Sequence, residues 1–228
     1  MTARDRLFAN LGRALAMAPG RVSPAEAAAR LDRRTPNLIP DRAQGSGEEL
    51  VERFVQWAER VQATTARVAT LADVPAAAAD FLNRHNLPQR LRLAPHPLIE
   101  GLDWSSRPLI EVASGRAEAH DLSSLALAFA GIAETGTLML HSGPQTPTTL
   151  NFLPDNHIVL LPARAIAGSY EAAWARLRAA FGDDWPRTVN LVTGPSRTAD
   201  IEQELILGAH GPRRLHIIIV DDDARQEG

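Results

Sequence analysis

The chain contains the stretch Gly131-Ile132-Ala133-Glu134-Thr135-Gly136-Thr137-Leu138-Met139-Leu140, in which a glycine-bounded turn lies between apolar segments. Residues 138–140 form a short apolar run that is typical of a buried strand, and another apolar run, from Leu125, leads into the turn. A carboxylate in this setting costs free energy unless it is paired, hydrogen-bonded or used in chemistry. Glu134 is therefore a candidate catalytic residue, although a structural role as a helix cap or as the partner of an arginine explains it equally well.

Capped helices alternate with apolar strands on both sides of this stretch. Helices are predicted to begin near Ser46, Asp73 and Ser169, which are residue types that favour a helix start. Strands are predicted at residues 66–69, 91–93, 108–112, 125–127, 137–140, 157–161, 189–193 and 215–220. The last two runs are apolar on both faces, as central parallel strands are. This alternation predicts an α/β fold, a layered and mostly parallel sheet with its helices, over residues 46–222.

The first 45 residues are predicted to form a helical extension of this domain. Leu7, Phe8, Leu11 and Leu15 lie on one face of a helix predicted between residues 3 and 16. Packing on the rest of the chain and docking of a partner both explain such an apolar face. Residues 223–228 are predicted to be a C-terminal tail.

Composition narrows the class of protein. The chain has 228 residues, of which 45% are hydrophobic, so it can bury a full core. Its net charge of -3 and the lack of a basic face argue against a nucleic-acid partner. The longest apolar run, residues 125–133, is far shorter than the roughly 20 residues of a membrane span. The charged, amphipathic N-terminus does not resemble a signal peptide, so we expect a cytoplasmic protein.

Two missing residue types limit the chemistry further. Without cysteine, the chain supplies no thiolate nucleophile, no disulfide and no cysteine ligand for zinc or an iron–sulfur cluster. Without lysine, it supplies no Schiff base, no covalent pyridoxal phosphate and no phosphate-loop lysine. No cofactor is predicted. No metal site is predicted either, because the histidines lack ligand spacing and Asp221-Asp222-Asp223 is typical of a solvated end.

Loops at strand ends carry the candidate binding residues, because open α/β sheets place their ligands there. Residues 193–200 are predicted to run from a strand into a helix start, which would be an anion site, although a plain helix cap explains them too. His157 is interpreted as a hydrogen-bonded residue at a strand start. The residues predicted to bind a substrate are Thr135, Gly136, Thr137, Gly143, Pro144, Gly194, Pro195, Ser196, Thr198, Asp200, His210 and Gly211.

Four separated motifs resemble the LUD-domain family. They are Ala133-Glu134-Thr135-Gly136-Thr137, Leu153-Pro154 with His157-Ile158, Thr193-Gly194-Pro195-Ser196 with Thr198-Ala199-Asp200-Ile201-Glu202, and Gly208 with His210-Gly211-Pro212 and Leu215-His216. The resemblance implies a fold like that of the NagB/RpiA/CoA-transferase superfamily. It also implies a role in oxidising L-lactate to pyruvate, with separate iron–sulfur subunits as partners and a small anionic ligand. In the family an arginine commonly lies between the Gly-Pro turn and the Leu-Pro motif, whereas residues 145–151 contain none.

Three functions from different classes remain open at this point. The chain is a subunit of a lactate-oxidising complex, a stand-alone enzyme of the phosphosugar-isomerase or CoA-transferase type, or a non-catalytic scaffold that binds a small ligand. In the second case Glu134 would be a base or a nucleophile. We favour the first function on the resemblance alone.

Overall fold

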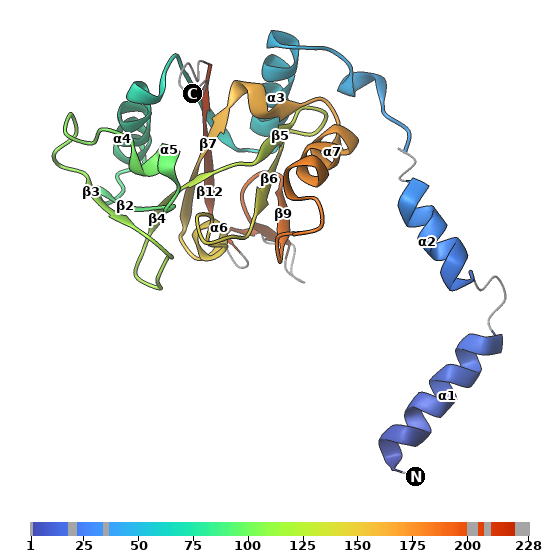
Figure 1. The fold of residues 1–228 in the computed structure, drawn as a ribbon. Helices are drawn as coiled ribbons and strands as arrows, with labels where there is room; N and C mark the ends of the chain where they lie inside the picture. The colour runs from blue at the N-terminus through green and yellow to red at the C-terminus, as the bar shows by residue number, and fades with distance from the viewer. Residues whose placement is uncertain (1, 18–21, 34–36, 200–204, 208–210, 222–228) are drawn as a thin grey trace. The chain divides into compact units, whose positions relative to one another are not determined.

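The computed structural model describes residues 2–17, 22–33, 37–199, 205–207 and 211–221, and it divides the chain into a unit of residues 1–38 and a unit of residues 39–228 (Figure 1). None of the helices within these described ranges is long and apolar enough to cross a membrane.

The N-terminal unit contains two helices, α1 (Ala3–Met17) and α2 (Pro24–Arg33). Ser23 and Glu26 form a capping box at the start of α2, because the Glu26 carboxylate accepts from the Ser23 amide at 2.8 Å and the Ser23 hydroxyl accepts from the Glu26 amide at 3.1 Å. The apolar face of α1 is not covered by the other described residues of this unit. The predicted extension is thus helical, and its boundary at residue 45 stays a prediction.

The second unit holds the sheets and the remaining helices. Its helices are η1 (Asp41–Ala43), α3 (Glu48–Arg60), η2 (Leu71–Asp73), α4 (Val74–Arg84), α5 (Pro97–Glu100), α6 (Thr149–Phe152), η3 (Ala163–Ala165) and α7 (Tyr170–Phe181). Its strands are β1 (Thr64–Val68), β2 (Arg90–Leu93), β3 (Glu111–Ser114), β4 (Ser123–Leu127), β5 (Ala130–Ile132), β6 (Thr137–His141), β7 (Asn156–Pro162), β8 (Ile166–Ala167), β9 (Val189–Val192), β10 (Arg197–Ala199), β11 (Leu205–Leu207) and β12 (Arg214–Val220).

The large sheet has six strands in the order β1-β12-β7-β4-β2-β3, and every neighbouring pair in it is parallel. Two of its interior strands, β7 and β12, are buried along almost their whole length. A strand that is covered on both faces must be apolar on both, and residues 215–220 satisfy this requirement. The predicted α/β class with a mostly parallel sheet is confirmed.

A second sheet lies against the large one and has the strand order β8-β5-β6-β9. Side chains alternate along β6, so Leu138 and Leu140 pack toward the large sheet and α3, whereas Met139 packs with Ala173 and Leu177 of α7. On the other face of the large sheet, α4 packs over β1 and β12. The layers are therefore α4, the large sheet, the small sheet with α3, and α7 (Figure 1).

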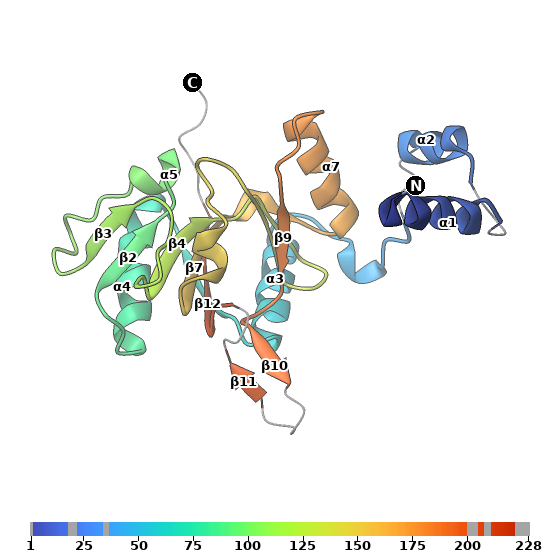
Figure 2. The same ribbon diagram turned by 90° about the horizontal axis from the view of Figure 1, so that it is seen from below.

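Two local predictions are wrong. Residues 189–193 are not a central parallel strand, because β9 pairs antiparallel with β6 at the edge of the small sheet, where Leu191 is 43% exposed. Residues 197–199, where a helix start was predicted, form β10 instead, which pairs antiparallel with β11 (Figure 2). Pairing with the apolar run Leu205–Leu207 satisfies the backbone of β10, and a local helix-start pattern does not reveal such a partner.

The stretch 131–140 forms an antiparallel hairpin of β5 and β6, with Ile132 opposite Thr137. Gly136 ends its turn at φ +64°, and a Cβ atom there would lie 2.2 Å from the backbone nitrogen of Ala58 in α3. Only glycine permits both this backbone conformation and this close approach. The hairpin turn is thereby pressed directly onto α3.

Replacing Gly136 with alanine should destabilise the second unit by about 3 kcal/mol, combining about 1–2 kcal/mol for the positive φ with about 1–3 kcal/mol for overpacking. Gly182 is the matched control, because it has φ +54° and no atom within 4 Å of the position of an added Cβ. Gly182→Ala should cost only about 1–2 kcal/mol. Urea unfolding of both variants measures the difference, and equal losses would show that the contact with α3 is unimportant.

Candidate functional site

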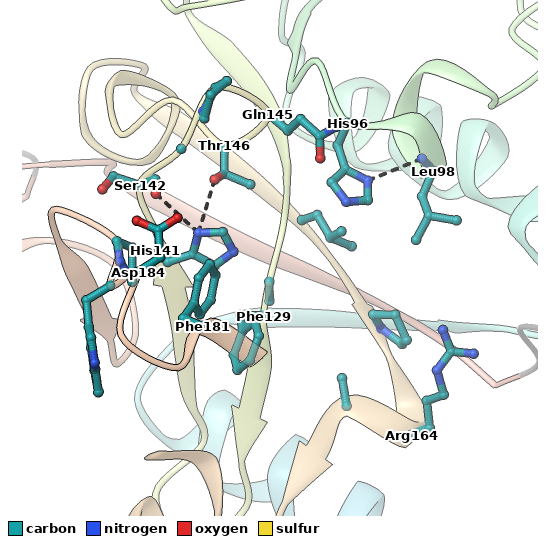
Figure 3. Close-up of a pocket in the computed structure, with 18 residues that line it drawn as sticks. His96, Leu98, Phe129, His141, Ser142, Gln145, Thr146, Arg164, Phe181 and Asp184 are labelled. Carbon is teal, nitrogen blue, oxygen red and sulfur yellow. Dashed lines mark hydrogen bonds between the residues drawn. The ribbon is translucent and has the colours of Figure 1, made fainter. Parts of the chain in front are cut away.

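The carboxyl ends of β2, β4 and β7 open into a pocket of about 760 Å³, which we call the carboxyl-edge pocket (Figure 3). Open parallel sheets place their ligands at this edge. The apolar part of its wall includes Leu98, Phe129, Phe181 and Trp185, and its polar side chains are His96, His141, Ser142, Gln145, Thr146, Arg164 and Asp184. Its volume lies within the range of about 300–1,000 Å³ that is usual for small-molecule sites.

His96 follows β2 and caps the start of α5, where its Nδ1 accepts a hydrogen bond from the Leu98 amide at 3.2 Å. In the neutral ring this bond assigns the proton to Nε2, which is a donor. Burial lowers the pKa of His96, and repulsion from the nearby His141 lowers it further. His96 therefore offers a neutral hydrogen-bond donor at neutral pH.

His141 is the last residue of β6 and lies edge-on to two aromatic rings, with centroid distances of 4.9 Å to Phe181 and 5.7 Å to Phe129. Its Nδ1 lies 3.3 Å from the carbonyl oxygen of Ser142, which can only accept, so Nδ1 is assigned as the donor. The neutral ring then presents Nε2 as an acceptor. His96 and His141 thus provide complementary donor and acceptor atoms.

Gly143 and Pro144, both predicted to bind a substrate, line this pocket as part of a tight turn. The Gly143 amide donates to the Thr146 carbonyl at 3.3 Å, and the Thr146 amide donates back to the Gly143 carbonyl at 3.1 Å. The turn holds its backbone in place beside His141. Gly143 and Pro144 thus lie at a strand-end pocket, and their contact with a substrate stays a prediction.

Arg164 lies in η3, directly after β7, and is the only arginine among the residues that line this pocket. Its guanidinium is charged at every physiological pH and suits a carboxylate or a phosphate. It comes to the pocket from an element other than the 145–151 segment, in which the family pattern has its arginine. Sequence reasoning missed both Arg164 and His96, although each closely follows a predicted strand.

Glu134 lies in the β5–β6 turn and is only 6% exposed. Its amide donates to the Gly168 carbonyl at 3.1 Å, and its own carbonyl accepts from Arg42 Nε at 3.2 Å. The carboxylate oxygen Oε2 is buried and has no hydrogen-bond partner among the described residues. Arg42 therefore holds the backbone and not the carboxylate. Glu134 does not line the carboxyl-edge pocket.

The predicted residues Thr135 and Thr137 take part in a cluster of hydroxyl groups with Tyr170 and Thr193. The Thr137 hydroxyl lies 2.7 Å from those of Thr135 and Thr193 and 3.0 Å from that of Tyr170. Thr137 is fully buried, so these bonds satisfy a hydroxyl that water does not reach. The cluster ties the hairpin turn to α7 and to the end of β9.

Four other predicted residues, Gly194, Pro195, Ser196 and Gly211, line a second pocket of about 210 Å³ at the amino ends of β7 and β12, the amino-edge pocket. His157 lines it too. Its two ring nitrogens are buried without a hydrogen-bond partner among the described residues, so none of these residues fills the hydrogen-bonded role predicted for His157. Burial lowers its pKa to about 3.

The anion site predicted at residues 193–200 requires a helix start, and the structure has β10 at residues 197–199 instead. Nearby, Arg213 approaches Asp155 at 3.7 Å, and Arg214 donates to Asn156 at 3.2 Å. Neither arginine lines the amino-edge pocket. Asp200, His210 and the side chain of Thr198 lie outside what the structure describes.

The sequence is similar to a set of curated proteins over part of its length. It is 36% identical over 93 residues to "Lactate utilization protein C" of Macrococcus caseolyticus, with 40% of each chain covered. A protein of the same name from Exiguobacterium is 33% identical over 127 residues, with 54% of each chain covered. An uncharacterized protein of Neisseria meningitidis is 41% identical over 93 residues, covering 41% of this chain and 40% of that one. The match thus spans about half or less of each relative.

A solved structure shares the fold. The crystal structure of a DUF162 family protein from Deinococcus radiodurans superposes with a TM-score of 0.58, covering 78% of this chain and 99% of that chain at 22% sequence identity. The family model described as "LUD domain" matches residues 51–220, which is well over half of the chain and contains both pockets. The chain therefore belongs to the LUD domain family.

Proposed function

We propose that this chain is a subunit of an L-lactate utilisation system and assists the oxidation of L-lactate to pyruvate together with separate iron–sulfur proteins. Relatives named "Lactate utilization protein C" support the process. The observation that carries the chemistry is the presence of Arg164, His96 and His141 in one pocket at the carboxyl edge of the parallel sheet.

Each of these three side chains is of a type that suits a polar group of lactate. The carboxylate suits the permanent cation of Arg164. The hydroxyl group suits the two imidazoles, because His141 Nε2 can accept its proton and His96 Nε2 can donate to its oxygen. The apolar wall of Phe129 and Phe181 excludes water from one side of the pocket.

The oxidation of lactate removes two electrons and two protons. In our proposal His141 takes the hydroxyl proton, the C2 hydrogen leaves as a second proton, and the two electrons would pass one at a time to the acceptor. The chain has no cysteine with which to hold an iron–sulfur cluster, so we assign the acceptor to the partner proteins. Turnover of an acyl-CoA or a phosphosugar by the chain alone would instead favour the stand-alone enzyme.

Other predicted roles stay part of this proposal. Gly143 and Pro144 would contact the ligand through the backbone of their turn. Glu134 would act on a ligand or partner group that reaches the β5–β6 turn, and its unpartnered carboxylate oxygen supports this role. We also propose a cytoplasmic location.

Arg164→Met should weaken the binding of L-lactate by about 10- to 100-fold, which is the change in affinity expected when one hydrogen bond to a charged group is lost. A strain that lacks its own copy of the chain should then grow poorly on L-lactate when it carries this variant. Arg90→Met is the matched control, because Arg90 pairs with Glu111 on the surface, where both side chains are exposed, and lies outside the pocket. Normal growth with Arg164→Met at an equal protein level would contradict the proposal.

Glu134→Gln should leave the free energy of unfolding within about 1 kcal/mol of the parent, as for an ordinary substitution, yet impair growth on L-lactate. Glu52→Gln, at an exposed position on α3, is the control for both measurements. Loss of a buried ion pair would instead cost about 3–5 kcal/mol. Such a loss in denaturant unfolding, or unimpaired growth, would remove Glu134 from the site.

A further inference from the structure

His157 combines complete burial with unused hydrogen-bonding capacity. It is 0% exposed at the start of β7, and neither Nδ1 nor Nε2 has a hydrogen-bond partner among the described residues. A buried polar atom that is left without a partner destabilises the fold. Such an atom in a folded protein calls for a physical explanation, and this ring lines the amino-edge pocket.

The described residues that line the amino-edge pocket are uncharged. Its described walls are made by Phe152, Leu191, Pro212 and Leu215 together with the turn 193–196, and these described lining residues include no arginine, aspartate or glutamate. Burial alone lowers the pKa of His157, so the ring is neutral at physiological pH. None of the described lining residues could be a counter-ion for a charged ligand, and burying an unpaired charge is costly.

Fixed contacts hold the walls of this pocket. The Thr193 hydroxyl bonds to Thr137 at 2.7 Å, and the Ser196 amide donates to the Pro212 carbonyl at 2.8 Å. Gly194, at φ +76°, is pressed so closely on α3's end that an added Cβ would lie 2.4 Å from the Val61 carbonyl oxygen. A pocket with walls tied in this way is largely formed before a ligand arrives.

We propose that the amino-edge pocket binds a small uncharged molecule with an apolar body and a single hydroxyl or carbonyl group, which hydrogen-bonds to His157. Its volume of about 210 Å³ is below that of most small-molecule sites and close to that of an engineered cavity of about 150 Å³ that binds benzene. The site is separate from the carboxyl-edge pocket and does not depend on the proposed role in lactate utilisation.

Three probes of similar size test this assignment on the full chain: phenol, toluene and benzoate. Ligand-detected NMR should show that phenol binds more tightly than toluene by about tenfold, the value of one buried hydrogen bond, and that benzoate does not bind. Phenol should shift the nitrogen signals of the His157 ring and leave those of His96 and His141 unchanged. His157→Leu should reduce the affinity for phenol to that for toluene.

Leu191→Trp keeps the experiment decisive if His157→Leu does not fold. Leu191 is partly exposed on the wall of the pocket, so the larger ring should fill the space, leave the core intact and abolish the binding of both phenol and toluene. Equal affinities for phenol and toluene, binding of benzoate at this pocket, or phenol signals that map to His96 and His141 would each overturn the proposal. The absence of any binding would mean that only water satisfies His157.

Discussion

The close approach of the β5–β6 turn to α3 is the constraint on which the rest of the second unit depends. Gly136 lies against the backbone of Ala58, and α3 contacts both β1 of the large sheet and β8 of the small one. The hairpin is thereby fixed between the two sheets. Because β6 has one end at each edge of the large sheet, it supplies His141 to the carboxyl-edge pocket and, through Thr137, supports Thr193 at the amino-edge pocket.

The two pockets differ in electrostatic character, and this difference decides what each can hold. The carboxyl-edge pocket has a permanent cation at Arg164 and two imidazoles with opposite hydrogen-bonding roles. The described residues that line the amino-edge pocket are neutral, and burial keeps the ring of His157 neutral. An anion in the carboxyl-edge pocket would therefore have the charge of Arg164 in the same pocket. In the amino-edge pocket, no described lining residue would offset the free-energy cost of removing the anion from water.

The local sequence pattern predicted those helices and strands whose structure is determined by their own residues. The N-cap Ser169 accepts from the Ala172 amide at 3.2 Å as expected, and the run at 215–220, which is apolar on both faces, lies in an interior parallel strand. Pattern failed where a distant partner decides the outcome. Residues 189–192 and 197–199 have strand pairings with segments that no local signal identifies.

In the candidate site, too, the sequence pattern pointed to some of the residues that line the pockets and missed others. Gly143, Pro144, Gly194 and Gly211 were predicted from loop composition and do line pockets, but these are two pockets at opposite edges of the sheet. Arg164 and His96 were missed because neither belongs to a recognisable motif and only the parallel sheet brings them together. A titration of the full chain with L-lactate, followed by the nitrogen NMR signals of its imidazole rings and assigned with His96→Gln and His141→Gln, tests the central claim most directly. The account predicts that the signals of His96 and His141 shift while those of His157 stay fixed, whereas a shift at His157, or no shift at His96 and His141, would contradict it.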